Sequence, residues 1–188
     1  VEAAVAALEQ ARQQPVGPDL RHRVEHCSVC PPPLLERLAQ AGALVVTQPA
    51  FIYYNGERYL SQVPSSQLPW LYRVRSFLEV GLRPAASSDA PVVPPEPLAG
   101  IYAAVTRRAA TGQAIGQQEA VSPLEALVMY TSAAAYSCFQ EGEKGSIEAG
   151  KLADLVLLDA DPTAVAIKDI GVAMTVLDGQ VVSTGGIR

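Results

Sequence analysis

The chain has 188 residues, 49% of them hydrophobic and 18% charged, with a formal net charge of -5 at pH 7. This balance is typical of a folded globular protein, not a disordered one, and it provides no basic surface for nucleic acid. No stretch approaches the roughly 20 continuous apolar residues of a spanning helix, and the first residues do not form a secretory signal. We therefore expect a soluble protein without a membrane partner. Three cysteines are too few for a disulfide framework, which favours the cytoplasm.

Helical and strand patterns alternate along most of the chain. In chain order, the patterns predict a helix at 1–14, a strand at 20–26, a helix at 31–42, a strand at 43–47, a loop at 50–67, a helix at 71–81, a strand at 82–88, and helices at 98–110 and 122–138. Pro15, Gly17 and Pro18 end the first helix. Ser122 and Glu125 have the spacing of a capping box, so the last helix begins there.

From Glu141 onward the chain becomes β-rich. Apolar runs at 153–158, 173–177 and 180–183 predict short strands, and Asp178-Gly179 between the last two has the sequence of a type I′ hairpin turn. We therefore expect a small β element in this part of the chain.

The alternation of helices and strands predicts right-handed βαβ units and a parallel sheet. Only three strands are available for it, whereas a closed (β/α)8 barrel needs about 250 residues. We therefore predict an α/β fold in which residues 1–140 are the C-terminal part of a (β/α)8 barrel and residues 141–188 are a second, β-rich domain. Because the chain opens on Val1, directly in a helical pattern, we expect it to be a piece of a longer protein.

Each predicted parallel strand ends at a polar residue: His26, Gln48 and Asp89. The small residues before Asp89 allow neighbouring elements to approach closely, and Pro91 prevents the strand from continuing. Since the C-terminal ends of parallel strands meet at one rim, we expect these side chains to converge.

Imidazole and carboxylate groups suit zinc and similar divalent ions, and a carboxylate beside such an ion can accept a proton from water. His26 and Asp89 are therefore candidate metal ligands, and Asp89 is also a candidate general base. The alternative is that His26 is a buried, hydrogen-bonded histidine and that Asp89 caps a helix or turn.

A rival site is formed by His22, His26, Cys27 and Cys30, which are four possible ligands within nine residues. Against it, His26 and Cys27 point to opposite sides of a strand unless the chain bends there, and no second Cys-x-x-Cys pair exists. The two cysteines are otherwise a redox pair or, by default, structural residues.

An aromatic group either lines a substrate pocket or packs on top of the sheet. It comprises Tyr53, Tyr54, Tyr59, Trp70 and Tyr72. We predict that Gln48, Tyr53 and Ser88 contact the substrate.

Arg107-Arg108 is more simply a pair that complements a helix dipole than an anion site, and Cys138 is expected in the core.

Several motifs together resemble the metal-dependent amidohydrolases, specifically the branch called amidohydrolase family 3. They are Arg23-Val24-Glu25-His26, Gln48-Pro49, Ser87-Ser88-Asp89-Ala90-Pro91-Val92, the run at 98–108, and the run at 144–155. The Gly-Ser-Ile-Glu-Ala-Gly-Lys-Leu-Ala-Asp-Leu sequence within the last run is the most specific of these marks. The motifs follow the family order along nearly the whole chain.

The resemblance implies a (β/α)8 barrel with an appended β-sandwich, to which the part from Glu141 would belong, and hydrolysis of C–N bonds with one or two divalent ions. It implies that His26 matches the histidine ligand after the sixth barrel strand. Asp89 would match the aspartate after the eighth, which binds metal and takes the proton of the attacking water. The family's ligands from the first, fourth and fifth strands have no counterpart here and are expected before Val1. Some members have a histidine shortly after the Gln-Pro, where this chain has Phe51 and Tyr53.

We therefore predict a fragment of a hydrolase that acts on a non-peptide C–N bond of a small molecule, with zinc as the expected metal and no activity in isolation. A second hypothesis is a non-catalytic folding or assembly module, in which unpaired strand edges around Val24 and Ala85 pair with another copy of the chain. A third is a small metal-binding domain built on the His/Cys group.

Overall fold

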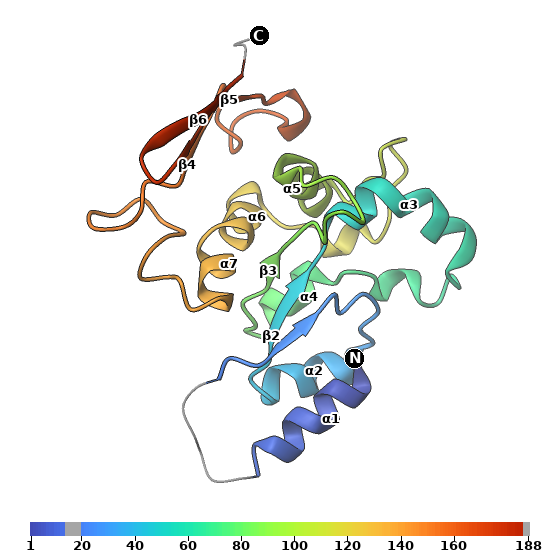
Figure 1. Ribbon diagram of the computed structural model, residues 1–188. Coiled ribbons are helices and arrows are strands. Elements are labelled where there is room, and N and C mark those ends of the chain that lie inside the picture. Colours follow the sequence, from blue (N-terminus) through green and yellow to red (C-terminus); the bar gives the residue numbers. More distant parts are fainter. Residues whose placement is uncertain (14–19, 186–188) are drawn as a thin grey trace.

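The computed structural model describes residues 1–13 and 20–185 (Figure 1). Pro15, Gly17 and Pro18, which are predicted to end the first helix, lie outside the described residues. The helices are α1 (Glu2–Ala11), α2 (Pro32–Gln40), α3 (Ala50–Gln62), α4 (Val74–Glu79), α5 (Pro97–Thr106), α6 (Pro123–Tyr130) and α7 (Ser132–Ser137), with 3-10 helices η1 (Leu68–Trp70), η2 (Gln117–Glu119) and η3 (Ile167–Asp169). The strands are β1 (Arg23–Glu25), β2 (Leu44–Thr47), β3 (Ala85–Ala86), β4 (Leu155–Leu158), β5 (Val172–Leu177) and β6 (Gln180–Thr184). No helix in these described ranges is long and apolar enough to cross a membrane.

The first three strands form a parallel sheet in the order β1-β2-β3, which confirms the predicted parallel arrangement. Figure 1 shows them side by side between the helices. The strands are shorter than the predicted segments 20–26 and 82–88. At β1 the reason is local: Arg21 and His26 have positive φ values of 44° and 63°, which take the backbone out of the extended conformation.

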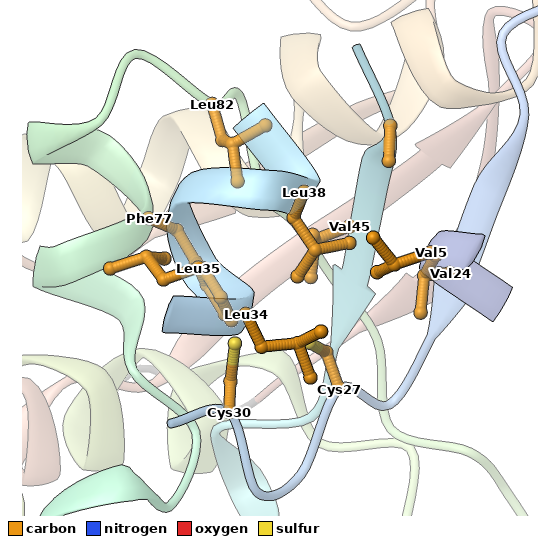
Figure 2. Packing of buried hydrophobic residues seen from close by; sticks show 11 residues of the cluster. Val5, Val24, Cys27, Cys30, Leu34, Leu35, Leu38, Val45, Phe77 and Leu82 are labelled. Carbon is orange, nitrogen blue, oxygen red and sulfur yellow. The ribbon is translucent and has the colours of Figure 1, made fainter. Parts of the chain in front are cut away.

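Helices α1, α2 and α4 pack with β1 and β2 around one hydrophobic cluster (Figure 2). The cluster comprises Val5, Val24, Cys27, Cys30, Leu34, Leu35, Leu38, Ala43, Val45, Phe77 and Leu82. Burying one Leu or Phe side chain stabilises a fold by about 1.5–3 kcal/mol, so this cluster is a major source of stability. At the surface, Arg37 of α2 donates to both carboxylate oxygens of Glu9 of α1, at 2.8 and 2.7 Å.

The predicted loop at 50–67 is wrong, because Ala50–Gln62 form the helix α3. This stretch resembles a loop in composition alone, because it contains tyrosines, polar residues and Gly56. Gly56 is buried, and a Cβ at this position would lie only 2.7 Å from the Cβ of Ala109. The helix therefore owes its stability to close tertiary packing near α5 more than to its own propensity.

The predicted helix at 122–138 is two helices, α6 and α7, which are separated at Thr131 with φ -124° and ψ -96°. The capping box is confirmed. The Ser122 hydroxyl accepts the amide of Glu125 at 3.2 Å, and the Glu125 carboxylate accepts the amide of Ser122 at 2.7 Å. Arg75 of α4 donates to both carboxylate oxygens of Glu125 at 2.9 Å each, so the cap also joins α6 to α4.

We expect Glu125→Gln to remove a pH-dependent part of the stability. The hydrogen bond from Arg75, followed by those from Ser122, lowers the pKa of Glu125 from 4.5 to about 2. Because the pKa is lower in the folded state, this contribution is complete above about pH 4.5 and is lost as the pH falls through about 2. Urea unfolding across this range should show the stability gap between wild type and variant closing toward low pH. Glu36→Gln, on α2, controls for the loss of a surface charge, and a gap in Glu125→Gln that is independent of pH would contradict the assignment.

The last three strands form an antiparallel sheet in the order β4-β5-β6. The predicted hairpin is confirmed: Asp178 and Gly179 join β5 to β6 with φ values of 49° and 75°, the left-handed backbone of a type I′ turn. In Figure 1 this sheet stands at the edge of the molecule. Its exposed apolar side chains include Val156, Leu157, Val181 and Val182.

Arg107 directly follows α5, which ends at Thr106, short of the end of the predicted helix at 98–110. The residue has a left-handed backbone with φ 53°, and its side chain is completely buried. The guanidinium donates to four carbonyl oxygens, those of Leu71 (2.8 Å), Tyr72 (2.9 Å), Ile115 (3.1 Å) and Gly116 (3.2 Å). The prediction that Arg107-Arg108 complements a helix dipole is therefore wrong for Arg107, which instead joins two loops.

Candidate active site

Polar residues lie at the C-terminal end of the parallel sheet. His26 directly follows β1, Gln48 directly follows β2, and Asp89 lies three residues beyond β3. Because the strands are parallel and adjacent, these positions share one end of the sheet, as the sequence predicts. The amide of Ser87 donates to the carbonyl of Thr47 at 2.9 Å, which carries the pairing of β2 and β3 up to this rim.

A series of hydrogen-bonded side chains crosses the rim. Nδ1 of His26 lies 2.9 Å from Oε1 of Gln48, and Nε2 of Gln48 donates to Oγ of Ser87 at 2.8 Å. Gln48 is only 2% exposed, so its side-chain amide is shielded from water. The Thr47 hydroxyl donates to the carbonyl of His26 at 2.9 Å. The neighbouring strand β2 and the residue after it thus hold His26 by both its ring and its backbone.

The backbone bends at His26 and Cys27, with φ values of 63° and 46°. The bend sends Cys27 into the core, where it is 1% exposed, and leaves His26 exposed at the rim. The alternative that His26 is a buried histidine is therefore wrong, although its ring is hydrogen-bonded. Asp89 also has a left-handed backbone, with φ 57°, a conformation that Asp and Asn adopt more readily than most residues.

Tyr72 lies within electrostatic reach of Asp89. Burial raises the pKa of Tyr72, hydrogen bonds with Ser28 and Tyr59 oppose the rise, and the Asp89 carboxylate adds to it. The hydroxyls of Tyr59 and Tyr72 are 2.9 Å apart, and the ring of Phe51 meets Tyr72 edge-on with centroids 5.9 Å apart. Part of the predicted aromatic group is therefore a packed, hydrogen-bonded unit near the carboxylate.

The rim offers two kinds of metal ligand. The exposed imidazole of His26 and the partly buried carboxylate of Asp89 are donors that fit a divalent ion such as zinc. Within residues 1–13 and 20–185, no group of three or more His, Cys, Asp and Glu side chains could hold a metal ion. Among the described residues, His26 and Asp89 therefore remain two candidate ligands.

The rival ligand group does not assemble. His22 and His26 are exposed, whereas Cys27 and Cys30 are 1% and 0% exposed within the hydrophobic cluster (Figure 2). This burial agrees with the default interpretation of the two cysteines as structural. Cys138, expected in the core, is instead an exposed free cysteine.

Tyr53 does not belong to the hydrogen-bonded rim. Its ring packs edge-on against Tyr54 and Tyr102, with centroids 5.0 and 5.7 Å apart. Because Tyr102 lies on α5, this contact joins α3 to α5. Tyr53 thus lies in the packing between two helices.

The two serines before Asp89 occupy different positions. Ser88 is partly buried, and its hydroxyl accepts the amide of Ala90 at 3.3 Å. Ser87 bonds Gln48 and so belongs to the rim. Ser87 is not among the predicted site residues, although the small-residue stretch that precedes Asp89 indicates this segment.

The chain is similar in sequence to known hydrolases. The sequence profile described as the Amidohydrolase family matches residues 1–183. N-substituted formamide deformylase of Arthrobacter pascens is 32% identical over 183 residues, which cover 95% of this chain and 34% of that protein.

Solved structures show the same similarity. An uncharacterised metal-dependent hydrolase of Pyrococcus horikoshii OT3 has a TM-score of 0.75 and 25% identity, with 89% of this chain and 33% of that chain covered. One from Pyrococcus furiosus has a TM-score of 0.70 and 28% identity, with 86% and 31% covered. This chain therefore spans about a third of the length of the proteins it matches. Since the family profile matches nearly all of its residues, the chain belongs to the metal-dependent amidohydrolase family.

Proposed function

We propose that this chain is the C-terminal part of a metal-dependent hydrolase that cleaves non-peptide, amide-type C–N bonds in small molecules. Residues 1–140 would form the last three βα units of a (β/α)8 barrel, and residues 141–188 would belong to an appended β-sandwich. The parallel sheet and the match to about a third of longer relatives support this division.

The observation that carries the proposal is the placement of His26 and Asp89 at the same end of one parallel sheet. In the complete protein these residues would hold a divalent ion, most suitably zinc, together with ligands from outside this chain. Such an ion lowers the pKa of water and polarises a carbonyl group. A carboxylate oxygen of Asp89 would accept the proton of the attacking water. The hydroxyl of Ser88, the residue that precedes Asp89 in the chain, is the proposed substrate contact.

Gln48 and Tyr53 fit the substrate role less well. The amide of Gln48 already bonds His26 and Ser87, and the ring of Tyr53 is packed between Tyr54 and Tyr102. We therefore assign these two residues to the support of the site.

N-formyl and N-acyl compounds are the substrate class we propose, since the Arthrobacter pascens relative is named an N-substituted formamide deformylase. The isolated chain should be inactive, because the rim supplies only part of a ligand set among the described residues. The complete protein is therefore the form to test.

Removal of metal from the complete protein should abolish hydrolysis of N-formyl compounds, and addition of Zn²⁺ should restore it. The physical reason is that neither His26 nor Asp89 alone generates a strong nucleophile from water at neutral pH. The measurement is turnover before dialysis against a chelator, after it, and after Zn²⁺ is returned, with metal content determined at each stage. Full turnover by protein shown to be free of metal would overturn the proposed function.

A further inference from the structure

The side-chain amide of Gln48 lies between two hydrogen-bond partners, the ring of His26 and the hydroxyl of Ser87. On one side it faces Nδ1 of His26 at 2.9 Å, and on the other it donates to Oγ of Ser87 at 2.8 Å. An amide oxygen can only accept a hydrogen bond, and an amide nitrogen can only donate one. The orientation of Gln48 therefore decides which nitrogen of the neutral His26 ring carries the proton.

The structure places Oε1 of Gln48 toward the imidazole and Nε2 toward Ser87. Nδ1 of His26 must then be the protonated nitrogen, since Oε1 has no hydrogen to give. A neutral imidazole has one N–H and one lone pair, so the lone pair is left on Nε2. Gln48 is 2% exposed, which means that water competes poorly for these bonds.

We propose that Gln48 is a positioning residue, which holds His26 in the Nδ1–H tautomer and so keeps Nε2 free to bind a divalent ion. Ser87 lies one step further away, where its hydroxyl oxygen accepts the other end of the same amide. Histidines that ligate metals usually donate the other ring N–H to a fixed acceptor. The tautomer stands on the hydrogen bonds alone, whereas its use for metal binding rests on the proposed function.

The chain has only two histidines, His22 and His26, which makes the tautomer directly measurable. We would label the full 188-residue chain with ¹⁵N-histidine and record long-range ¹H–¹⁵N spectra without metal, at a pH where the rings are neutral. His22→Asn assigns the signals by elimination. His26 should show a protonated Nδ1 and an unprotonated Nε2, with the other tautomer disfavoured by about tenfold, as expected of one hydrogen bond.

Two variants test the role of Gln48. Gln48→Met has a similar length without an acceptor and should lose most of this tautomer preference. Gln48→Glu keeps an acceptor for Nδ1 and should retain the preference. Circular dichroism reports whether each variant is folded, and the wild-type spectrum with Gln48→Glu keeps the test decisive if Gln48→Met does not fold.

The proposal is overturned if the wild-type chain carries the proton mainly on Nε2, or if a folded Gln48→Met variant leaves the His26 spectrum unchanged. Titration with Zn²⁺ then tests the metal separately. A selective shift of the Nε2 signal would support the use of this atom as a ligand. A clear Nδ1–H tautomer with no response of His26 to Zn²⁺ would contradict the metal-binding use and leave the positioning role of Gln48 intact.

Discussion

Asp89→Asn should lower kcat for C–N hydrolysis in the complete protein by about 100-fold or more, the range expected for loss of a general base. Asparagine has the shape of aspartate but does not accept a proton at neutral pH. It also tolerates the left-handed backbone of this position, where φ is 57°, so the loop should keep its conformation. The expected loss is therefore chemical, and the measurement is kcat and KM together with the metal content of each preparation.

Glu96→Gln is the matched control, because Glu96 lies in the same connection between β3 and α5 and bonds the hydroxyl of Tyr54, not the rim. We expect little change in kcat there. If Asp89→Asn also loses metal, turnover is measured again with Zn²⁺ in excess, which separates a lost ligand from a lost base. Turnover of Asp89→Asn equal to that of wild type would refute the role of Asp89.

The features that the sequence predicts correctly are governed by local rules. The β-branched run that becomes β2, the Asp178-Gly179 turn and the capping box of Ser122 each depend on residues within a few positions of one another. The shared rim follows from these local elements by one topological rule, because consecutive βαβ units give parallel strands. For this reason the sequence alone could place His26 and Asp89 at the same end of a sheet.

The features that the sequence misses depend on contacts between distant segments. Nothing near Gly56 shows that Ala109 will lie against it and make a glycine necessary there. Likewise, Ser87 belongs to the rim through its hydrogen bond with Gln48, which lies at the end of the neighbouring strand and 39 residues away in the chain. Charge patterns also mislead, since Arg107 and Arg108 look alike in sequence although only Arg107 is buried.

Arg107→Met should lower the free energy of unfolding by about 3 kcal/mol or more, because each buried carbonyl left without a donor costs about 1–3 kcal/mol. The guanidinium is the donor to the carbonyls of Leu71 and Ile115, one in each of two loops. The carbonyls of Tyr72 and Gly116 also accept backbone amides, from Val74 and Glu119. Burial lowers the pKa of Arg107 to about 10, with Glu119 and Tyr72 opposing, so the group stays charged at neutral pH. Methionine fills much of the same space but has no donor. Urea unfolding of the chain, followed by circular dichroism, measures the loss.

The neighbouring arginine provides the control for this experiment. Arg108 is exposed, and among the described residues its side chain donates to the carbonyl of Gly112 at 2.6 Å, so Arg108→Met should change the stability by no more than about 0.5 kcal/mol. Arg107→Lys keeps the charge but not the planar fork that reaches both loops, and should fall between the two. An Arg107→Met variant as stable as Arg108→Met would contradict this prediction, because it would mean that the carbonyls of the two loops do not need the guanidinium as a donor. The predicted loss would instead show that the buried guanidinium of Arg107 stabilises the loop that contains Tyr72. The electrostatic environment of Tyr72 includes Asp89, so this loop also bears on the candidate site.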